Sequence, residues 1–271
     1  MLLLRNNPVQ EKPLIRGAFS CYNISMFTDS HCHLHDRQFF TDEQAKQMLK
    51  NAKNNGIKRI ICIGTDPEDS LAARDFAESH EGVFWTYGVH PSEKNTVNNF
   101  VKDDKLVAIG EVGLDYHYEP YDRAAQIRLF EEMLQLAIDN NLPVSFHIRE
   151  AFDDFFAVVK NFPKVRGVVH SFSDSKKNLK KILETTDFYI GVNGLATYST
   201  LPTPPLERTL LETDAPFLTP FKKRDTINEP AYIKDIAYWL STKLGVSPEQ
   251  ISEQTEQNVQ RLFSLSNSIL R

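Results

Sequence analysis

Two histidines one residue apart, His31 and His33, follow a short apolar stretch that begins at Phe27. In an extended chain, residues i and i+2 point to the same face, so the two imidazoles can lie side by side. Two neutral imidazole nitrogens at this spacing are suited to bind one divalent metal ion. Because a His-x-His pair also occurs by chance, its meaning depends on the other side chains that the fold would bring beside it.

Four further side chains of the kind that binds metals stand at the ends of other apolar runs, namely Glu111, His147, His170 and Asp214. If these runs are parallel strands of a barrel, their carboxyl ends meet on one face, where active sites of such barrels lie. Six donors exceed the coordination shell of a single ion, but they suit two ions that share a bridging carboxylate. The sequence therefore predicts a two-metal centre.

The elements that would position this centre recur along the chain. Apolar runs predict strands at residues 27–31, 59–63, 83–88, 106–111, 143–147, 167–170, 188–192 and 209–214. Stretches with helical spacing of apolar residues follow them, as at 42–55, 122–140 and, closing the chain, 255–265. Eight strand–helix units with continuously apolar strands predict an α/β fold, a (β/α)8 TIM barrel that spans residues 27–271 as one domain.

Two parts of the chain depart from this repeat. The segment between the seventh and eighth strands carries Pro202, Pro204 and Pro205. Because proline at this density opposes a helix, we expect an irregular loop there. Residues 1–26 show no clear pattern, and we expect them to form an extension before the barrel.

Composition narrows the class of protein. The chain has 271 residues, of which 41% are hydrophobic and 25% are charged, a balance typical of globular proteins. Its net charge of −5 gives no broad basic field, so a polyanion would have to be held by local cations and metal. The three cysteines have no CxxC spacing, which indicates a reducing compartment, and we expect a cytoplasmic protein. No apolar run approaches the roughly 20 residues of a membrane span, so we expect no membrane contact.

Several motifs together resemble the TatD family of metal-dependent deoxyribonucleases, within the amidohydrolase-like barrels. They are TDSHCHL, YGVHP, IGEVGLDY, SFHIRE, HSFS, LLETDAPFLTP and INEP, spread from about residue 27 to about residue 265. The resemblance implies a (β/α) barrel that hydrolyses phosphodiester bonds in DNA, often from the 3′ end. It further implies two metal sites bridged by Glu111, one completed by His31, His33 and Asp214 and the other by His147 and His170.

The identity of the two divalent ions is open at this point. The resemblance implies dependence on magnesium. Magnesium prefers oxygen ligands, whereas four imidazoles favour manganese, iron, cobalt or zinc, so the purified protein is expected to carry a transition metal. Water bound to a metal ion loses a proton near neutral pH and becomes a nucleophile.

Further residues are candidates for catalysis or substrate binding. Asp214 can hold the attacking water and accept its proton. Glu212 lies two residues earlier on the same face and either supports the metals or lies inside the barrel. We expect substrate contacts from side chains near the strand ends, namely His90, Tyr116, Arg149 and Arg224. Among these, Arg149 offers a guanidinium fork that matches phosphate.

Our leading expectation is a DNase that acts as a monomer and as a 3′–5′ exonuclease, and two other functions compete with it. One is a small-molecule hydrolase of amide, lactone or phosphoester bonds. Such barrels often use a lysine as the bridging ligand on the fourth strand, where this chain has Glu111. The other is a relict barrel without catalysis, which the complete set of ligands argues against.

Overall fold

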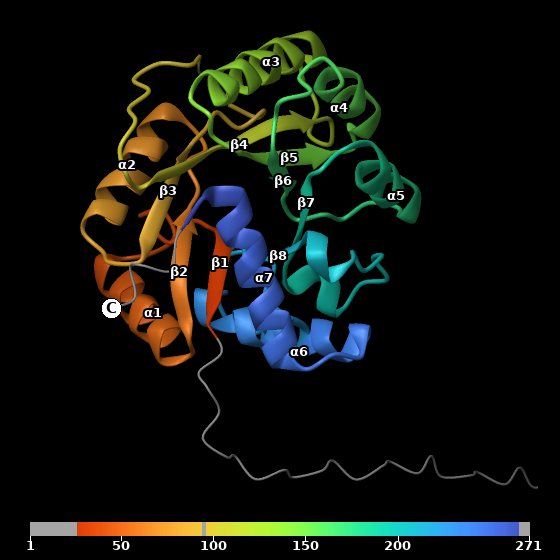
Figure 1. Ribbon diagram of the computed structural model, residues 1–271. Helices are drawn as coiled ribbons and strands as arrows, with labels where there is room; N and C mark the ends of the chain where they lie inside the picture. The colour runs from red at the N-terminus through yellow and green to blue at the C-terminus, as the bar shows by residue number, and fades with distance from the viewer. Residues whose placement is uncertain (1–25, 94–95, 266–271) are drawn as a thin grey trace, which may run out of the picture.

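Eight parallel strands pair in sequence order, β1 through β8, in the computed structural model, which describes residues 26–93 and 96–265 (Figure 1). They are β1 (Phe27–Cys32), β2 (Ile57–Cys62), β3 (Val83–Tyr87), β4 (Leu106–Asp115), β5 (Val144–Arg149), β6 (Gly167–Val169), β7 (Tyr189–Val192) and β8 (Thr209–Leu211). This is the TIM-barrel architecture that the sequence predicts. Of the expected extension at 1–26, residues 1–25 lie outside the described part of the chain.

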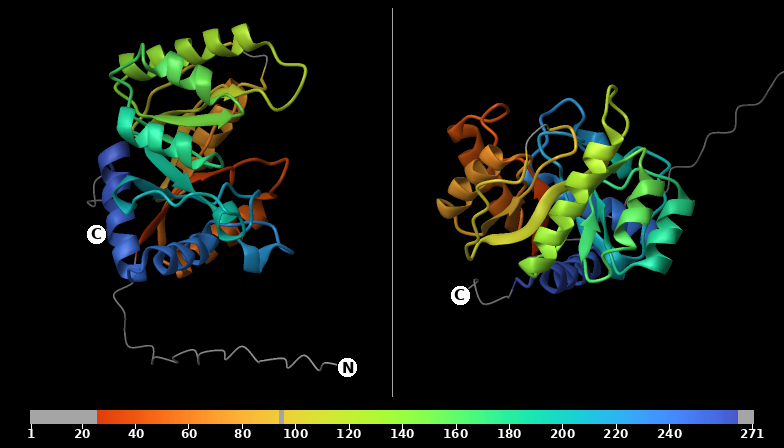
Figure 2. Two further views of the ribbon diagram at one scale, coloured as in Figure 1. Left: turned by 90° about the vertical axis from the view of Figure 1, so that its right-hand side faces the viewer. Right: turned by 90° about the horizontal axis from the view of Figure 1, so that it is seen from above.

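Helices surround the strands (Figures 1 and 2). They are α1 (Asp42–Asn54), α2 (Pro67–Glu78), α3 (Arg123–Asp139), α4 (Phe152–Val159), α5 (Lys176–Thr185), α6 (Ile233–Leu244) and α7 (Pro248–Phe263). Their ends follow from local chemistry. The hydroxyls of Thr41 and Ser247 cap α1 and α7 in capping boxes, and the Asp66 carboxylate caps α2. No helix in the described ranges is long and apolar enough to cross a membrane.

The first and last strands meet at their carboxyl ends through a short set of backbone hydrogen bonds. The Asp214 N–H donates to the carbonyl oxygen of His31 at 2.8 Å, and the His33 N–H donates to that of Ala215, also at 2.8 Å. The Thr213 N–H donates to Oδ1 of the buried Asp29 at 2.9 Å. This seam places Asp214 beside the two histidines of β1.

Helix α7 covers the opposite, amino-terminal end of the barrel, and Figure 1 shows it lying across the strands. Its buried residues Val259, Leu262 and Phe263 pack in one cluster with residues of the strands. A buried ion pair joins Arg59 of β2 to Glu256 of α7 at 2.6 Å. The predicted closing helix is confirmed, although it begins at Pro248 rather than at residue 255. With this end covered, the barrel opens at the carboxyl ends of its strands.

Two crossovers lack an α-helix among the described residues. Between β7 and β8 the chain forms only the short 3-10 turns Gly194–Thr197 and Leu206–Arg208, as the prolines predict. A helix was also expected after each of the remaining strands. This prediction was wrong between β3 and β4, where residues 88–93 and 96–105 are irregular. Pro91 and a polar, asparagine-rich sequence oppose a helix there, and Asn99 has a positive φ of 54°.

Candidate metal centre

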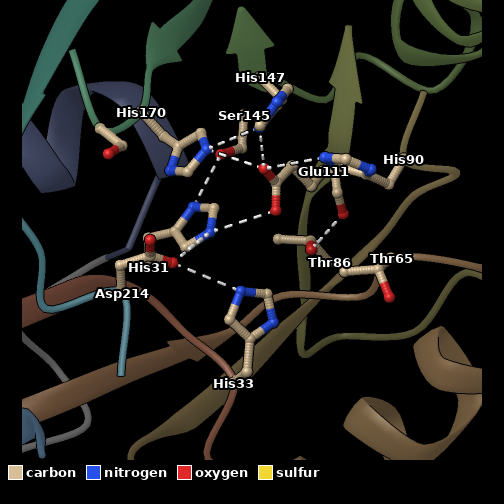
Figure 3. Close-up of polar contacts among 12 residues, drawn as sticks. His31, His33, Thr65, Thr86, His90, Glu111, Ser145, His147, His170 and Asp214 are labelled. Carbon is tan, nitrogen blue, oxygen red and sulfur yellow. Dashed lines mark hydrogen bonds and ion pairs between the residues drawn. The ribbon is translucent and has the colours of Figure 1, made fainter. Parts of the chain in front are cut away.

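Glu111 of β4 lies at the centre of the open end of the barrel and is 4% exposed. Its Oε1 is 2.7 Å from Nδ1 of His147 and 2.8 Å from Nε2 of His170, whereas its Oε2 is 3.5 Å from Nε2 of His31 (Figure 3). These histidines come from β5, from the end of β6 and from β1. The two oxygens of one carboxylate therefore face two separate groups of imidazoles.

Asp214 completes the side of the cluster that belongs to β1. Its Oδ1 lies 3.5 Å from Nε2 of His31 and 3.5 Å from Nε2 of His33 (Figure 3). Strand β8 ends at Leu211, so Asp214 stands in the turn that follows, with a positive φ of 58°, and not on a strand that runs to residue 214 as predicted. The backbone bond to His31 holds the turn in place.

This donor set fits divalent cations. Two groups of candidate ligands share Glu111. One consists of Glu111, His31 and His33, and the other of Glu111, His147 and His170. Within each group the ligand atoms lie within 4.8 Å of one another. Nδ1 of His31 lies 3.3 Å from the Ser145 hydroxyl, while its buried Nε2 has no hydrogen-bond partner in the described part of the chain. An imidazole that is held through Nδ1 and keeps Nε2 within 3.5 Å of two carboxylate oxygens is oriented as a metal ligand requires.

Neighbouring charges within the cluster counteract the effect of burial on its side chains. Burial alone would raise the pKa of Glu111, but its histidine neighbours, His170 foremost, hold that pKa well below its usual range. Burial would lower the pKa of His170, yet the Glu111 carboxylate outweighs it and raises the pKa to about 10. His31 stacks on His170 with ring centroids 3.9 Å apart, and burial together with the His170 charge lowers its pKa to about 4. The two stacked imidazoles thus have pKa values shifted in opposite directions.

Asp115 is part of the site and was missed by the sequence reasoning. Its Oδ2 lies 2.9 Å from Nε2 of His147, so that histidine has Glu111 on one ring nitrogen and Asp115 on the other. A carboxylate on the second nitrogen fixes the orientation of a ligating imidazole. The signal was present in the sequence, because residues 111, 113 and 115 alternate along one strand and share a face. The middle residue, Gly113, leaves room for the backbone of His147, whose carbonyl oxygen would lie 1.9 Å from an added Cβ.

Glu212 lies inside the barrel beneath the cluster, with no exposed surface. Its Oε1 accepts a hydrogen bond from the Ser171 N–H at 2.6 Å and lies 3.8 Å from Nδ1 of His170. Burial raises the pKa of Glu212 to about 7, against the nearby His170 charge. Glu212 is inside the barrel and also forms a candidate metal-holding group with His31 and His170, so its role in supporting the metals stays a prediction.

Of the predicted substrate contacts, His90 borders the cluster, and Arg149 follows His147 along β5. The ring of His90 lies 4.3 Å from that of His147, and its Nε2 is 3.8 Å from Oε1 of Glu111. Burial lowers the pKa of His90 to about 4, so this imidazole is neutral near pH 7. Arg149 ends β5, two residues beyond His147, and its guanidinium lies over the ring of Tyr118 at 4.9 Å.

The other two predicted contacts lie among the loop residues of the rim. The Tyr116 hydroxyl donates to Asp154 at 2.7 Å, and the same carboxylate pairs with Arg123. Arg224 lies over the ring of Tyr198 at 4.8 Å. Among the described residues, neither Tyr116 nor Arg224 makes a polar contact with the six candidate ligands. Their role in substrate binding stays a prediction.

Known proteins match this chain over nearly its whole length. A family model described as TatD related DNase matches residues 28–264. The chain belongs to this family. It is 30% identical over 258 residues to an uncharacterized metal-dependent hydrolase, YabD of Bacillus subtilis, covering 89% of this chain and 100% of the relative. It is 33% identical over 261 residues to the 3′-5′ ssDNA/RNA exonuclease TatD of Pantoea vagans, covering 88% and 99%.

A solved structure agrees with these matches. The TatD homolog YjjV of Escherichia coli superposes with a TM-score of 0.79 at 27% identity, covering 90% of this chain and 100% of that one. The family and the cluster of ligands make this TatD-family protein a metal-dependent hydrolase, as the sequence predicts.

Proposed function

We propose that this TatD-family hydrolase cleaves phosphodiester bonds in DNA and removes nucleotides from the 3′ end of a single strand, with two divalent ions. The observation that carries the proposal is the position of Glu111, whose two oxygens face separate histidine groups at the open end of the barrel. A shared carboxylate between two ion sites is the arrangement that clamps a phosphodiester on both sides. The Pantoea vagans relative, described as a 3′-5′ exonuclease of single-stranded DNA and RNA, supports this substrate class.

The residues divide into two sets of ligands. His31, His33, Glu111 and Asp214 would hold one ion, and Glu111 with His147 and His170 would hold the other. Divalent ions, when bound there, would lower the pKa of a water molecule and offset the charge that develops on the phosphate oxygens.

Asp214 is the best placed proton acceptor. Burial alone would raise its pKa, but His33, His31 and His170 hold that pKa below its usual range, so the carboxylate is ionised near pH 7. An ionised carboxylate at the edge of the cluster can orient the attacking water and accept its proton. The neutral His90 can donate a hydrogen bond to a phosphate oxygen, and Arg149 can bind a neighbouring phosphate with its fork.

The test is an assay of protein reconstituted separately with magnesium, manganese and cobalt. The substrates are single-stranded DNA, double-stranded DNA and single-stranded RNA, all labelled at the 5′ end. The proposal predicts a ladder of labelled products that shortens one nucleotide at a time, fastest on the single strands, and no ladder from the Glu111→Gln variant. If no nucleic acid is cleaved with any of the three metals, the proposal fails and a small-molecule hydrolase becomes the better account.

A further inference from the structure

Two phenylalanines are exposed at the rim of the candidate metal centre. Phe39 lies in the loop after β1 and is 43% exposed, and Phe217 lies in the loop after β8 and is 45% exposed. Their rings meet edge to face with centroids 5.1 Å apart. The ring of Phe217 also lies 6.2 Å from that of His33, one of the candidate ligands. This exposed aromatic pair therefore directly borders the cluster.

Packing within the fold does not account for this pair. Both rings leave nearly half of their surface in water, where apolar area is unfavourable. A pair of adjacent exposed aromatic rings beside a polar cluster has the composition of a ligand-binding patch.

Charge around the open end favours this side for a polyanion. On the side of β3 and β4, a cavity of about 870 Å³ is lined by five acidic residues and one basic residue, which are Glu93, Asp115, Glu119, Asp122, Glu132 and Arg128. On the side of β8, the loop that carries Phe217 continues into three consecutive cations, Lys222, Lys223 and Arg224. The side of β8 therefore carries more positive charge than the side of β3 and β4 and attracts a nucleic-acid backbone more strongly.

We propose that Phe39 and Phe217 form a stacking platform for a nucleobase next to the scissile phosphate of a single strand. The inference rests on the proposed function and names the substrate subsite of the same centre. Every base presents a π-face, so stacking on aromatic side chains binds single strands with little sequence preference. A paired base has its faces covered by its neighbours in the stack, so the platform favours unpaired ends.

The test compares strands that differ only in the base concerned. The wild-type protein, loaded with manganese, is given a short oligodeoxyadenylate and two copies of it, one abasic at the 3′-terminal nucleotide and one abasic at the next. We expect kcat/KM for one of the abasic strands to be about tenfold below that for the intact strand. In Phe217→Ala this ratio falls to near one, and in Phe217→Tyr it is retained.

Tyr238→Ala is the matched control, because this aromatic residue is 60% exposed on α6 and makes no ring contact with the pair among the described residues. It should keep the wild-type ratio. A wild-type protein that cleaves all three strands equally well would overturn the platform while leaving the proposed function intact.

Binding of the same strands, measured by fluorescence anisotropy with calcium in place of manganese, separates the two proposals further. Selective loss of affinity for an abasic strand, abolished by Phe217→Ala, supports the platform even if no strand is cleaved. Equal affinity for all strands, or no affinity for any, contradicts it.

Discussion

Two parts of the open barrel end differ in how their side chains are held. We call the six candidate ligands the floor, and the residues of the surrounding loops, with Arg149 at the end of β5, the rim. On the floor, Glu111 of β4 and His170 after β6 are nearly buried and contact one another in front of the intervening strand β5. On the rim, Phe217 and Arg224 lie in the loop after β8 and are exposed. The floor is held by strand register and can present one fixed constellation of ligands. The rim is held by a few loop contacts, so it can vary in what it binds without disturbing the metals. This contrast assigns chemistry to the floor and substrate choice to the rim.

Among the changes considered, Asp214→Asn on the floor should have the largest effect, and that effect is on catalysis. The change removes the proposed proton acceptor, so kcat should fall by about 10²–10⁴-fold. Affinity for single-stranded DNA should change much less, because the rim is untouched. Single-turnover cleavage and equilibrium binding, measured together with metal content, check this. Full activity with metal bound would remove Asp214 from the role of base.

The floor should also show a steep dependence of metal affinity on pH. The pKa of His170 is raised to about 10 in the metal-free protein, so the imidazole is protonated near pH 7 and must lose its proton to become a ligand. Affinity for manganese should therefore rise with pH, by about tenfold per unit for one displaced proton, and level off above the pKa of His170.

Calorimetry in buffers of different ionisation enthalpy counts the protons released on binding. A manganese affinity that is independent of pH, with no proton released, would contradict a protonated His170 that becomes a ligand.

Asp115→Asn should weaken the floor by about 10–100-fold in metal affinity or activity, because it removes the carboxylate that orients His147. Glu150→Gln is the matched control, since Glu150 pairs with the exposed His117 at 2.6 Å outside the cluster. The measurement is a manganese titration of both variants. Equal titration curves for Asp115→Asn and Glu150→Gln would show that Asp115 does not support the centre.

The floor and the rim also differ in how far their residues could be predicted from the sequence. His31, His33, Glu111 and His147 end apolar runs, and strand periodicity alone brings such residues to one face. Asp115 was missed because the predicted fourth strand stopped at residue 111, whereas β4 continues through Asp115. The strand was ended at its first charged residue, although the apolar and buried Val112 and Leu114 continue it to Asp115.

The rim could be predicted only as a list of residue types. The hydroxyl of Tyr116, expected to meet a nucleotide, is held by Asp154, which lies 38 residues further along the chain. The pairing of Phe39 with Phe217 joins loops at opposite ends of the sequence. Neither contact has a periodic signature, because loop conformations depend on backbone angles and long-range packing rather than on local spacing.

The smallest expected effect comes from Arg149→Ala on the rim. Its guanidinium lies beside the Tyr118 ring at the edge of the site, so its loss should weaken binding of single-stranded DNA by a few fold. The slope of log affinity against log salt should decrease by about 0.7 for one phosphate contact to a single strand. Metal content should stay at the wild-type level.

Arg166→Ala serves as the control for this change, because Arg166 is exposed just before β6, at the amino-terminal end of the strand. If both variants bind DNA with the same affinity and salt slope, Arg149 makes no phosphate contact.

The central claim is that Glu111 bridges two metal sites. Crystals of the protein soaked in manganese, with diffraction recorded at the manganese absorption edge, test it most directly. The account predicts two anomalous peaks, one on each side of the Glu111 carboxylate. The first should contact His31, His33 and Asp214, and the second His147 and His170. A single peak, or peaks that do not share Glu111, would contradict it.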